Sequence, residues 1–367
     1  MVRAGDPAAP APRFVGGLAF APGTADGPAW RGFGDARFVL PRWTYARRGD
    51  LAWLTAIVDG DARTPAARDV WHGELAEVRA ALAAPAAAEP PPVVAIAEAD
   101  PEVWRRHIAE IRAAISAGTA AKIVAARACA VELAGPAEPA AVLRRLGERH
   151  PECTRFAIRV GGRVFLGASP ERLVAVTGLE VTTDALAGSI ARAGGGPDAD
   201  ADERAALEAS AKDRGEHDLV VEAIAAGLGP LCARLDVPDR PAVRTLRNIH
   251  HLHTPVRGLL AAPRHVVEVA AALHPTPAVA GVPTRVALDW IAAREPEARG
   301  WYAAPVGWFD ADGDGELVVA IRSGVLDGRH ALLYAGGGIV AASDPDAELD
   351  ETRVKLRALL GALGATA

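Results

Sequence analysis

The sequence of 367 residues predicts an α+β fold in one large domain. Short apolar runs interrupted by glycine and proline predict strands and hairpins, and longer stretches with helical periodicity predict helices. No internal repeat and no clear linker divides the chain, and its length suits one large domain. We therefore expect a loose Ala/Pro-rich tail at 1–14 and a single domain at 15–367.

The first third of the chain predicts strands followed by two helices. Residues 14–58 predict strands and hairpins, because FVGGLAF, ARFVLPRWTYAR and LAWLTAIV alternate with Gly/Pro breaks. Residues 66–86 predict a helix, which the stiff segment AEPPPVV follows. The next helix begins at Asp100-Pro101, an N-cap acid before a first-turn proline, and ends at Gly118.

The remaining two thirds predict a mixture of strands and helices. KIVAARACAVEL predicts a strand, and three apolar runs near the C-terminus predict a three-stranded meander. Further strands are expected at 154–160, 163–168 and 172–177, helices at 201–228, 262–273, 283–294 and 345–362, and the meander at 304–309, 316–325 and 330–335.

Composition excludes several classes of function. A net charge of −6 provides no basic surface for nucleic acid. No apolar run approaches the roughly 20 residues of a membrane span, and the N-terminal segment lacks the apolar core of a secretory signal. Cys129, Cys153 and Cys232 form no CxxC pair, which predicts reduced thiols in a cytoplasmic protein and argues against zinc.

Two acidic pairs on predicted helices are the best candidates for a metal site. Asp213 and Glu216, in KDRGEHDLVVEAI, are three residues apart and share a helix face, and Glu348 and Glu351 repeat the spacing. Carboxylates from two helices suit a hard cation such as Mg²⁺. The alternative is two solvated acidic helix faces.

Only three of the 40 basic residues are lysines: Lys122, Lys212 and Lys355. Arginine does not replace lysine where a compact ammonium or a titratable amine is needed, so each lysine is a candidate for a specific role. The alternative is that a coding bias replaced most lysines with arginine and left these three at positions without a specific role. Lys212, His217 and Lys355 lie beside the acidic pairs, where they add an anion-binding character that argues against solvated faces.

Lys122 and Glu171 are candidates for acid–base chemistry. Lys122 shares a strand face with Val124 and Ala126, and such apolar surroundings lower the pKa of a lysine toward that of a base. The alternative is an edge-strand lysine that discourages aggregation. Glu171 follows FLGASP at a strand end, where apolar neighbours raise the pKa of a carboxyl toward that of a proton donor.

Four further segments carry residue types that are found in ligand-binding sites. In FDADGDGELV the twelfth position from Asp310 is Ile321, not the glutamate of a calcium loop, so a hairpin is expected. YAGGGIV brings backbone N–H groups where they can hold carboxylate oxygens, or forms a simple turn; it lacks the spacing of a nucleotide-binding loop.

Arg322, on a predicted central strand, requires an anionic partner if it is buried. The histidines of HHLHT, 250–253, are expected in core-facing or hydrogen-bonding roles.

Taken in order, these segments resemble the chorismate-utilising enzymes, strongly over about 120–358 and only in general layout before that. The resemblance rests on KIVAAR, FLGASPERL, DALAGSIAR, AKDRGEHDLVV, HHLHTPVRG, LHPTPAVAGVP, WYAAPVGWFDADGDGELVVAIRSG and YAGGGIVAASDPDAELDETRVKL. It implies a fold like that of aminodeoxychorismate (ADC) synthase, a four-layer α/β/β/α arrangement with two packed sheets and outer helices. The sequence has GGG where many relatives have GAG.

Within this family the chain is most similar to isochorismate synthases. Lys122 stands where isochorismate and salicylate synthases carry a lysine that activates water, and anthranilate synthases lack it. Aminodeoxychorismate synthases carry a lysine where this chain has Ala187. Ala278-Val279 of TPAVAG resembles isochorismate synthases more than salicylate synthases.

The resemblance implies an Mg²⁺-dependent isomerase that converts chorismate to isochorismate. Mg²⁺ would be held by Glu216 and Glu351, with Asp213 and Glu348 in support. Lys122 would deprotonate the attacking water, and Glu171 would protonate the departing 4-hydroxyl. The residues that the resemblance places on the substrate are Gly188, Ser189, His251, Tyr302, Arg322, Gly336, Gly337, Gly338 and Lys355.

Several alternatives stay open at this point. A salicylate synthase would go on to eliminate pyruvate, and a catalytically silent relative would only bind a ligand or partner. The product would feed siderophore or menaquinone biosynthesis. Chorismate is the only partner expected, with no nucleic acid or membrane, and a monomer is the family expectation; Lys212 has no assigned role.

Overall fold

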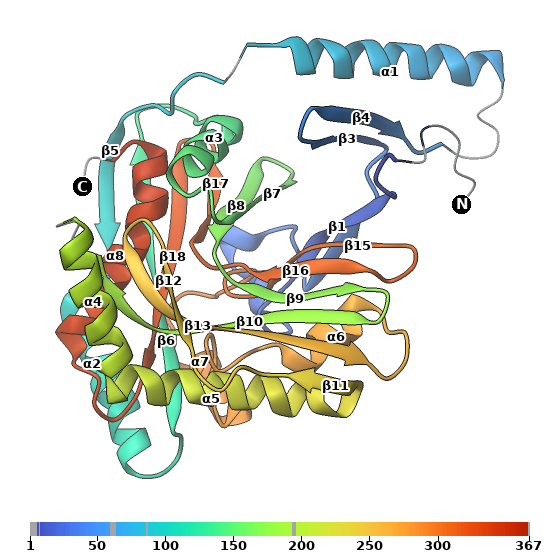
Figure 1. The fold of residues 1–367 in the computed structure, drawn as a ribbon. Helices are drawn as coiled ribbons and strands as arrows, with labels where there is room; N and C mark the ends of the chain where they lie inside the picture. The colour runs from blue at the N-terminus through green and yellow to red at the C-terminus, as the bar shows by residue number, and fades with distance from the viewer. Residues whose placement is uncertain (1–5, 7, 59–63, 86, 193–195, 366–367) are drawn as a thin grey trace.

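The computed structural model describes residues 6, 8–58, 64–85, 87–192 and 196–365. Two large antiparallel sheets pack against each other and helices cover their outer faces (Figure 1). The predicted α+β class and its layered arrangement are confirmed.

The first sheet has nine strands among the described residues. Their order is β11-β13-β10-β9-β16-β15-β1-β2, and β12 also pairs with β13. The strands are β1 (Arg13–Leu18), β2 (Ala36–Val39), β9 (Arg172–Thr177), β10 (Glu180–Ala191), β11 (Cys232–Asp236), β12 (Ala242–Thr245), β13 (Ile249–Leu260), β15 (Pro305–Asp310) and β16 (Gly315–Val319).

The second sheet has seven strands over the same described ranges. Their order is β14-β6-β18-β17-β8-β7, and β5 also pairs with β6. The strands are β5 (Val93–Glu98), β6 (Lys122–Leu133), β7 (Thr154–Val160), β8 (Arg163–Ser169), β14 (Gly281–Val282), β17 (Ser323–Asp327) and β18 (His330–Ile339). The strand predicted from KIVAARACAVEL is therefore β6, the long strand beside β18.

Each sheet has its own set of helices. Three pack on the seven-stranded sheet: α2 (Pro101–Ser116), α3 (Pro139–Arg149) and α8 (Pro345–Leu363). Three pack on the nine-stranded sheet: α4 (Pro197–Ala209), α5 (Ala211–Leu228) and α6 (Val266–Leu273). Helix α7 (Thr284–Arg294) packs against β14 and β6, and short 3₁₀ turns occupy Thr24–Asp26, Pro28–Trp30 and Gly229–Leu231.

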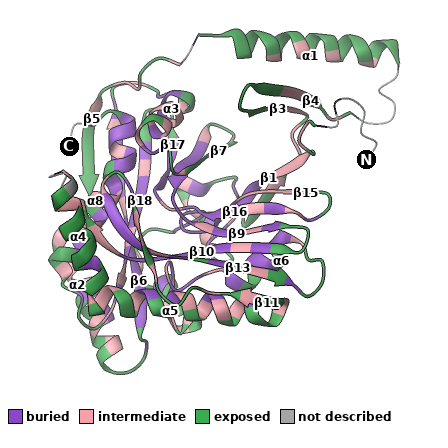
Figure 2. Cartoon of the chain, viewed as in Figure 1, coloured by how far each residue is buried: buried purple, intermediate pink, exposed green. Residues whose placement is uncertain are grey.

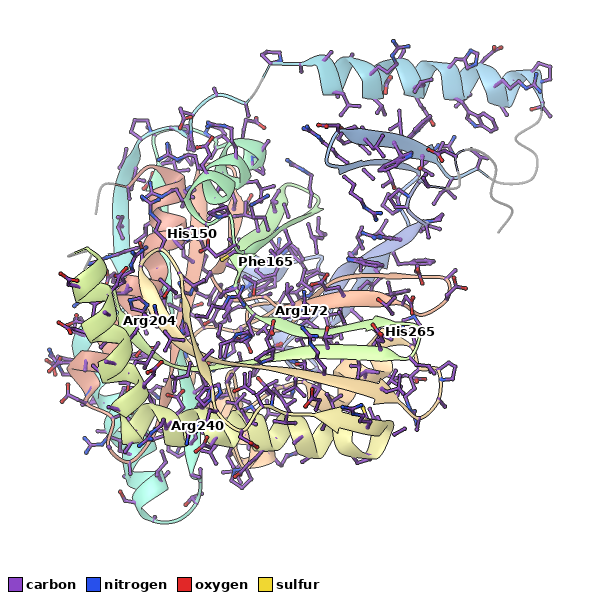
Figure 3. The ribbon with its side chains drawn as sticks, in the orientation of Figure 1. His150, Phe165, Arg172, Arg204, Arg240 and His265 are labelled. Atoms are coloured by element: carbon purple, nitrogen blue, oxygen red, sulfur yellow. The ribbon has the colours of Figure 1, made fainter. Side chains whose placement is uncertain are left out.

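An aromatic cluster forms part of the core that the two sheets share. Phe165 of β8, labelled in the middle of Figure 3, packs against Trp30 and Trp301 at ring distances of 5.1 and 6.3 Å, and Phe33 joins them. A second buried cluster, which includes Leu166 and Leu359, joins the seven-stranded sheet to α3 and α8. Figure 2 shows this burial concentrated on the strands, whereas α1 is largely exposed and the other helices combine buried and exposed residues.

One predicted helix is two helices in the structure. The expected helix at 201–228 is divided at Ser210, which caps α5: its hydroxyl accepts a hydrogen bond from the Asp213 N–H at 3.2 Å. Neither glycine nor proline marks this break, so the periodic pattern runs through it. The break sets the direction of α5, which carries Glu216.

The predicted three-stranded meander is wrong. The run 316–325 forms two strands, β16 in the nine-stranded sheet and β17 in the seven-stranded sheet. Arg322 lies where the chain crosses between the sheets, with φ of 52°, a left-handed conformation that is uncommon for a residue with a side chain. The Asp-Gly hairpin is confirmed: Asp310 joins β15 to β16 and accepts hydrogen bonds from the N–H groups of Asp312 and Asp314.

The N-terminal third contains the predicted strands and helix. The hairpin of β3 (Trp43–Arg48) and β4 (Leu51–Ala56) forms a sheet of its own, and α1 (Pro65–Ala83) lies over it, away from the two large sheets (Figure 1). No residue of α1 is buried. The predicted tail falls partly outside the described residues, and β1 begins at Arg13. None of the helices in the described ranges is long and apolar enough to cross a membrane.

Candidate active site

A pocket of about 700 Å³, counting the space open to solvent at its mouth, is lined by both sheets and by α5 and α8. Most of the predicted site residues meet there. Those that line it are Glu171, Gly188, Ser189, Glu216, His251, Tyr302, Arg322, Gly336, Gly337, Gly338, Glu351 and Lys355. Lys122, Asp213 and Glu348 do not line the pocket but contact residues that do.

Lys122 begins β6 and is completely buried. Its Nζ lies 2.8 Å from Oε1 of Glu216 on α5. The contact is ionic, since over the described chain the ammonium has no hydrogen-bond partner of good geometry. Burying an ammonium is costly unless its charge is compensated, so Glu216 makes the position of Lys122 possible.

Glu171 lies in the short connection between β8 and β9 and is 3% exposed. Its backbone is fixed by Ser169, whose hydroxyl accepts from the Glu171 N–H at 3.2 Å and donates to the Val319 carbonyl at 2.6 Å. Burial, together with the nearby charge of Asp184, raises the pKa of Glu171 to about 8. This carboxyl therefore carries a proton at neutral pH, as a general acid must.

A β-bulge shapes the pocket wall at Gly188. The register of β10 against β13 shifts between Ala187 and Ser189, and Gly188 has φ of 73°. A Cβ at Gly188 would lie 2.9 Å from the Asp213 carbonyl oxygen, so a larger residue does not fit. The bulge orients Ser189, whose N–H donates to Asp213 Oδ1 at 3.3 Å and whose hydroxyl donates to Glu351 Oε1 at 2.9 Å.

Three carboxylates and three lysines converge beside this wall. Lys122 pairs with Glu216, Lys212 Nζ lies 2.9 Å from Glu348 Oε1, and Lys355 Nζ lies 2.6 Å from Glu351 Oε1. Asp213 differs, because its carboxylate accepts from Ser210 and from the Ser189 N–H. It braces the bulge, whereas each of the three glutamates faces a lysine.

The two α8 glutamates differ in their electrostatics. Burial raises the pKa of Glu348, and the charge of Glu351 adds to this against the opposing effect of Lys212. Burial also acts to raise the pKa of Glu351, but Lys355, Ser189 and Lys212 outweigh it and the pKa lies below its usual value. Glu351 is therefore ionised at neutral pH.

Gly338 allows the lysine and the glutamate to meet. A Cβ at this position would lie 2.3 Å from Glu216 Oε1 and 2.5 Å from Lys122 Cε. The glycines belong to β18, where Gly338 pairs with Val124 of β6, and not to a loop after the strand. They leave room for side chains from α5 and α8 to reach the strand.

Arg322, which contacts His251, gives the pocket a cationic side. Arg322 is 9% exposed, and its Nη2 lies 3.3 Å from Nε2 of His251. Burial, with the charges of Arg322 and Lys355, holds the pKa of His251 well below its usual value, so the ring is neutral and its Nε2 accepts from the guanidinium. Within the described residues no carboxylate lies within 4.0 Å of Arg322, which leaves a buried cation able to bind an anionic ligand.

Tyr302 and Lys355 complete the pocket. Tyr302 stacks on Tyr334 at 5.1 Å, and burial raises its pKa to about 12, so its hydroxyl stays protonated. Lys355 donates to the Gly336 carbonyl at 2.8 Å in addition to its pair with Glu351. A hydroxyl donor and an ammonium thus border the glycine strand.

One expectation about this region is wrong. His217 does not add anion-binding character, because burial lowers its pKa and its ring hydrogen-bonds to the Ala187 carbonyl and the Thr254 hydroxyl, at 3.2 and 2.8 Å. It anchors the strand just before Gly188. By contrast, the expectation for the HHLHT histidines is confirmed: His250 and His253 make hydrogen bonds with Thr245 and Asp184.

Arg299 lines the pocket although no sequence motif pointed to it. It is 2% exposed, and Glu295 holds it while its guanidinium donates to the carbonyls of Val279 and Val124 at 2.6 and 3.0 Å. It therefore ties the loop of TPAVAG to β6. The i, i+4 spacing of Glu295 and Arg299 is the only sequence signal that could have found it.

A separate carboxylate–histidine group lies near α4. Ligand atoms of Asp200, Glu203 and His250 lie within 4.8 Å of one another. Arg192 already binds both carboxylate oxygens of Asp200, and Thr245 contacts the other ring nitrogen of His250. These contacts explain the group as an ion-pair network that fixes α4 to β13.

Comparison with known proteins agrees with this geometry. The family described as chorismate binding enzyme matches residues 2–364. The salicylate biosynthesis isochorismate synthase of Pseudomonas aeruginosa is 40% identical over 364 residues, which cover 97% of this chain and 75% of that protein. Isochorismate synthase MenF of Bacillus subtilis is 35% identical over 358 residues, covering 96% of this chain and 75% of that protein.

Solved structures show the same fold. The menaquinone-specific isochorismate synthase MenF of Escherichia coli superposes with a TM-score of 0.82 at 30% identity, over 96% of this chain and 78% of that one. Anthranilate synthase component I of Streptococcus pneumoniae shares the fold with a TM-score of 0.79 at 22% identity, over 97% of this chain and 82% of that one. The chain therefore belongs to the chorismate-binding enzyme family.

Proposed function

We propose that the protein is an isochorismate synthase, an Mg²⁺-dependent isomerase that converts chorismate to isochorismate. The observation that carries the proposal is the presence of a buried lysine, Lys122, and a buried glutamate with a raised pKa, Glu171, at the same site as the three glutamates that face lysines. Relatives named as isochorismate synthases, 35–40% identical over nearly the whole chain, support it.

The reaction needs a base and an acid. Lys122, in its uncharged amine form, accepts a proton from a water whose oxygen forms a bond to the ring carbon next to the ring carboxylate. The ring double bonds shift, the C4–O bond breaks, and Glu171 gives its proton to the departing hydroxyl, which leaves as water. One water is consumed and one released, so the product is an isomer. Each proton transfer contributes about 10²–10⁴-fold to the rate.

The residues present fit a magnesium ion. Glu216, Glu348 and Glu351 supply hard oxygen ligands from two helices, and Mg²⁺ is held by carboxylates together with water and substrate oxygens. We assign Glu216 and Glu351 as ligands with Glu348 beside them, and Asp213 as their support through Ser189. When bound, the ion would supply positive charge to the ring carboxylate of the substrate.

The cationic side of the pocket fits the second carboxylate of chorismate. Arg322 is buried and has no carboxylate partner in the described chain, and Tyr302 presents a protonated hydroxyl nearby. Lys355 and the backbone of Gly336–Gly338 border the same space. A dianionic substrate would thus find positive charge at both ends, which orients the ring between Lys122 and Glu171.

The product distinguishes this function from its rivals. Purified protein incubated with chorismate and Mg²⁺ should form isochorismate, resolved by chromatography. Salicylate with pyruvate as the main product would identify a salicylate synthase instead, and no turnover at saturating Mg²⁺ would indicate a silent relative. Isochorismate would serve siderophore or menaquinone biosynthesis; the matched Escherichia coli structure is described as menaquinone-specific, and the Pseudomonas aeruginosa relative is named for salicylate biosynthesis. The free thiols suit the cytoplasm.

A further inference from the structure

The three lysines of the chain each pair with a different glutamate of the site. The N–O distances are 2.8 Å for Lys122–Glu216, 2.9 Å for Lys212–Glu348 and 2.6 Å for Lys355–Glu351. The positive charge that a divalent cation would bring is thus already supplied by side chains of the chain itself.

Lys212 differs from the other two lysines in its freedom to move. The Lys122 side chain is 0% exposed, and Lys355 also donates to the Gly336 carbonyl. The Lys212 side chain is 34% exposed, and the partner of its ammonium is Glu348, which is itself 2% exposed. The Lys212 side chain can therefore move out into solvent, whereas the buried Glu348 side chain cannot.

Local preference does not explain a lysine at this position. Lys212 lies in the first turn of α5, where the helix dipole disfavours a cation. Its favourable electrostatic interactions are with Glu348, Glu351 and Glu216, the three site carboxylates. A lysine that stands against the dipole of its own helix and contacts a buried carboxylate of another helix departs from the local sequence preference. Such departures are typical of functional positions.

The oxygens of the three glutamates are not gathered closely enough for all three to bind one cation as they stand. Over the described ranges, Asp200, Glu203 and His250 are the group whose ligand atoms lie within 4.8 Å of one another, and the site glutamates do not form such a group. Mg²⁺ binds oxygen at about 2.0–2.1 Å, which requires closer oxygens. Each carboxylate is instead turned to its own ammonium.

We propose that Lys212 is a displaceable counter-cation, which holds Glu348 away from Glu216 and Glu351 until a divalent cation takes its place. The proposal rests on the magnesium site of the proposed function and adds a positioning residue to it. Breaking the Lys212–Glu348 pair is then part of the cost of binding the metal, and the ammonium lowers the affinity of the free protein for divalent cations.

Metal titration without substrate tests the proposal. Mg²⁺, and Mn²⁺ as a second probe, are titrated calorimetrically into the wild type and into Lys212→Met. Removing a partly exposed ion pair should tighten metal binding by about fivefold. Lys212→Arg, which keeps the charge, should bind metal about as tightly as the wild type. Arg214→Met removes an exposed cation two residues away on the same helix and should bind metal as the wild type does.

An affinity of Lys212→Met that is unchanged, weaker, or matched by Arg214→Met would overturn the proposal. Thermal unfolding verifies that the variant folds, and Lys212→Gln replaces it if it does not. Glu351→Gln separates this test from that of the metal site itself. Weak binding in Glu351→Gln with no gain in Lys212→Met refutes the role of Lys212 alone, whereas wild-type turnover of chorismate that does not depend on Mg²⁺ refutes the magnesium site.

Discussion

At the scale of single residues, the proposed reaction depends on two buried groups with opposite tasks. Lys122 was singled out by the rarity of lysine, and the structure places it in a fully buried position beside Glu216. Glu171 was singled out by its place at a strand end, and its raised pKa agrees with a proton donor. Both roles remain predictions that single substitutions can test.

Lys122→Arg keeps the positive charge but should lose activity. A guanidinium stays protonated and cannot accept a proton from water, so turnover of chorismate should fall about 10²–10⁴-fold. Steady-state kinetics measure the loss, and thermal unfolding shows whether the longer side chain is tolerated. Turnover near that of the wild type would exclude Lys122 as the base.

The pH dependence of kcat/KM should report Glu171. Its pKa is about 8, so the carboxyl holds its proton below that pH and loses it above. Activity should therefore fall as pH rises through about 8. Glu171→Gln should lose both the turnover and the decrease in activity near pH 8. Glu180 is exposed on β10, so Glu180→Gln should keep the turnover and the pH dependence of the wild type. A profile that is flat up to pH 9 would contradict the assignment.

The same group predicts a change in stability with pH. The unfolded chain releases this proton near pH 4.5, and the folded protein holds it to about 8. Between those values the folded state binds more protons, so the contribution of Glu171 to the free energy of unfolding decreases as pH rises. Unfolding of Glu171→Gln should lack this component, which can be measured without any substrate.

At the scale of elements, the site depends on how closely α5 approaches β18. Gly338→Ala would insert a Cβ 2.3 Å from Glu216 Oε1 and 2.5 Å from Lys122 Cε. We expect turnover to fall about 10²-fold, because a displacement of the order of 1 Å disrupts the acid–base geometry. Gly215→Ala is the matched control, since no atom lies within 4 Å of the Cβ it would add to α5. Equal activities of the two variants would show that the close approach is unimportant.

Most elements could be predicted where local signals mark their ends. Asp100 caps α2 and Asp344 caps α8, and both helices begin at a following proline. The break at Ser210 was missed because a serine cap leaves the helical periodicity intact. The sequence does not indicate the break at Arg322, because the apolar run 316–325 continues across it. The change from one sheet to the other depends on pairing with distant strands.

At the scale of the whole molecule, the site exists because two layers meet. Glu216 comes from α5 on the nine-stranded sheet, and Glu351 comes from α8 on the seven-stranded sheet. Helical spacing predicted that each pair of acids shares a face, but not that the two faces converge. The lysine pairing, the neutral His217 and the buried Arg299 also depend on tertiary contacts that no local pattern contains.

Glu351→Gln tests whether the two helices share a metal. Removing one charge from α8 should raise the Mg²⁺ concentration needed for half-maximal turnover by about tenfold, since each ligand carboxylate contributes directly to binding. Asp350→Asn, one residue away and 72% exposed in its pair with Arg353, is the control and should leave the titration unchanged. An unaltered Mg²⁺ titration of Glu351→Gln would remove this residue from the metal site.

The source of the new hydroxyl oxygen distinguishes the proposed reaction from an internal shift of the hydroxyl. If Lys122 activates water and Glu171 expels the 4-hydroxyl, the new hydroxyl of isochorismate comes from solvent. Turnover of chorismate in ¹⁸O-labelled water, followed by mass spectrometry of the product, should show one labelled oxygen per molecule of isochorismate. Isochorismate formed without label would mean that the hydroxyl moves within the substrate, and would contradict the roles of both residues.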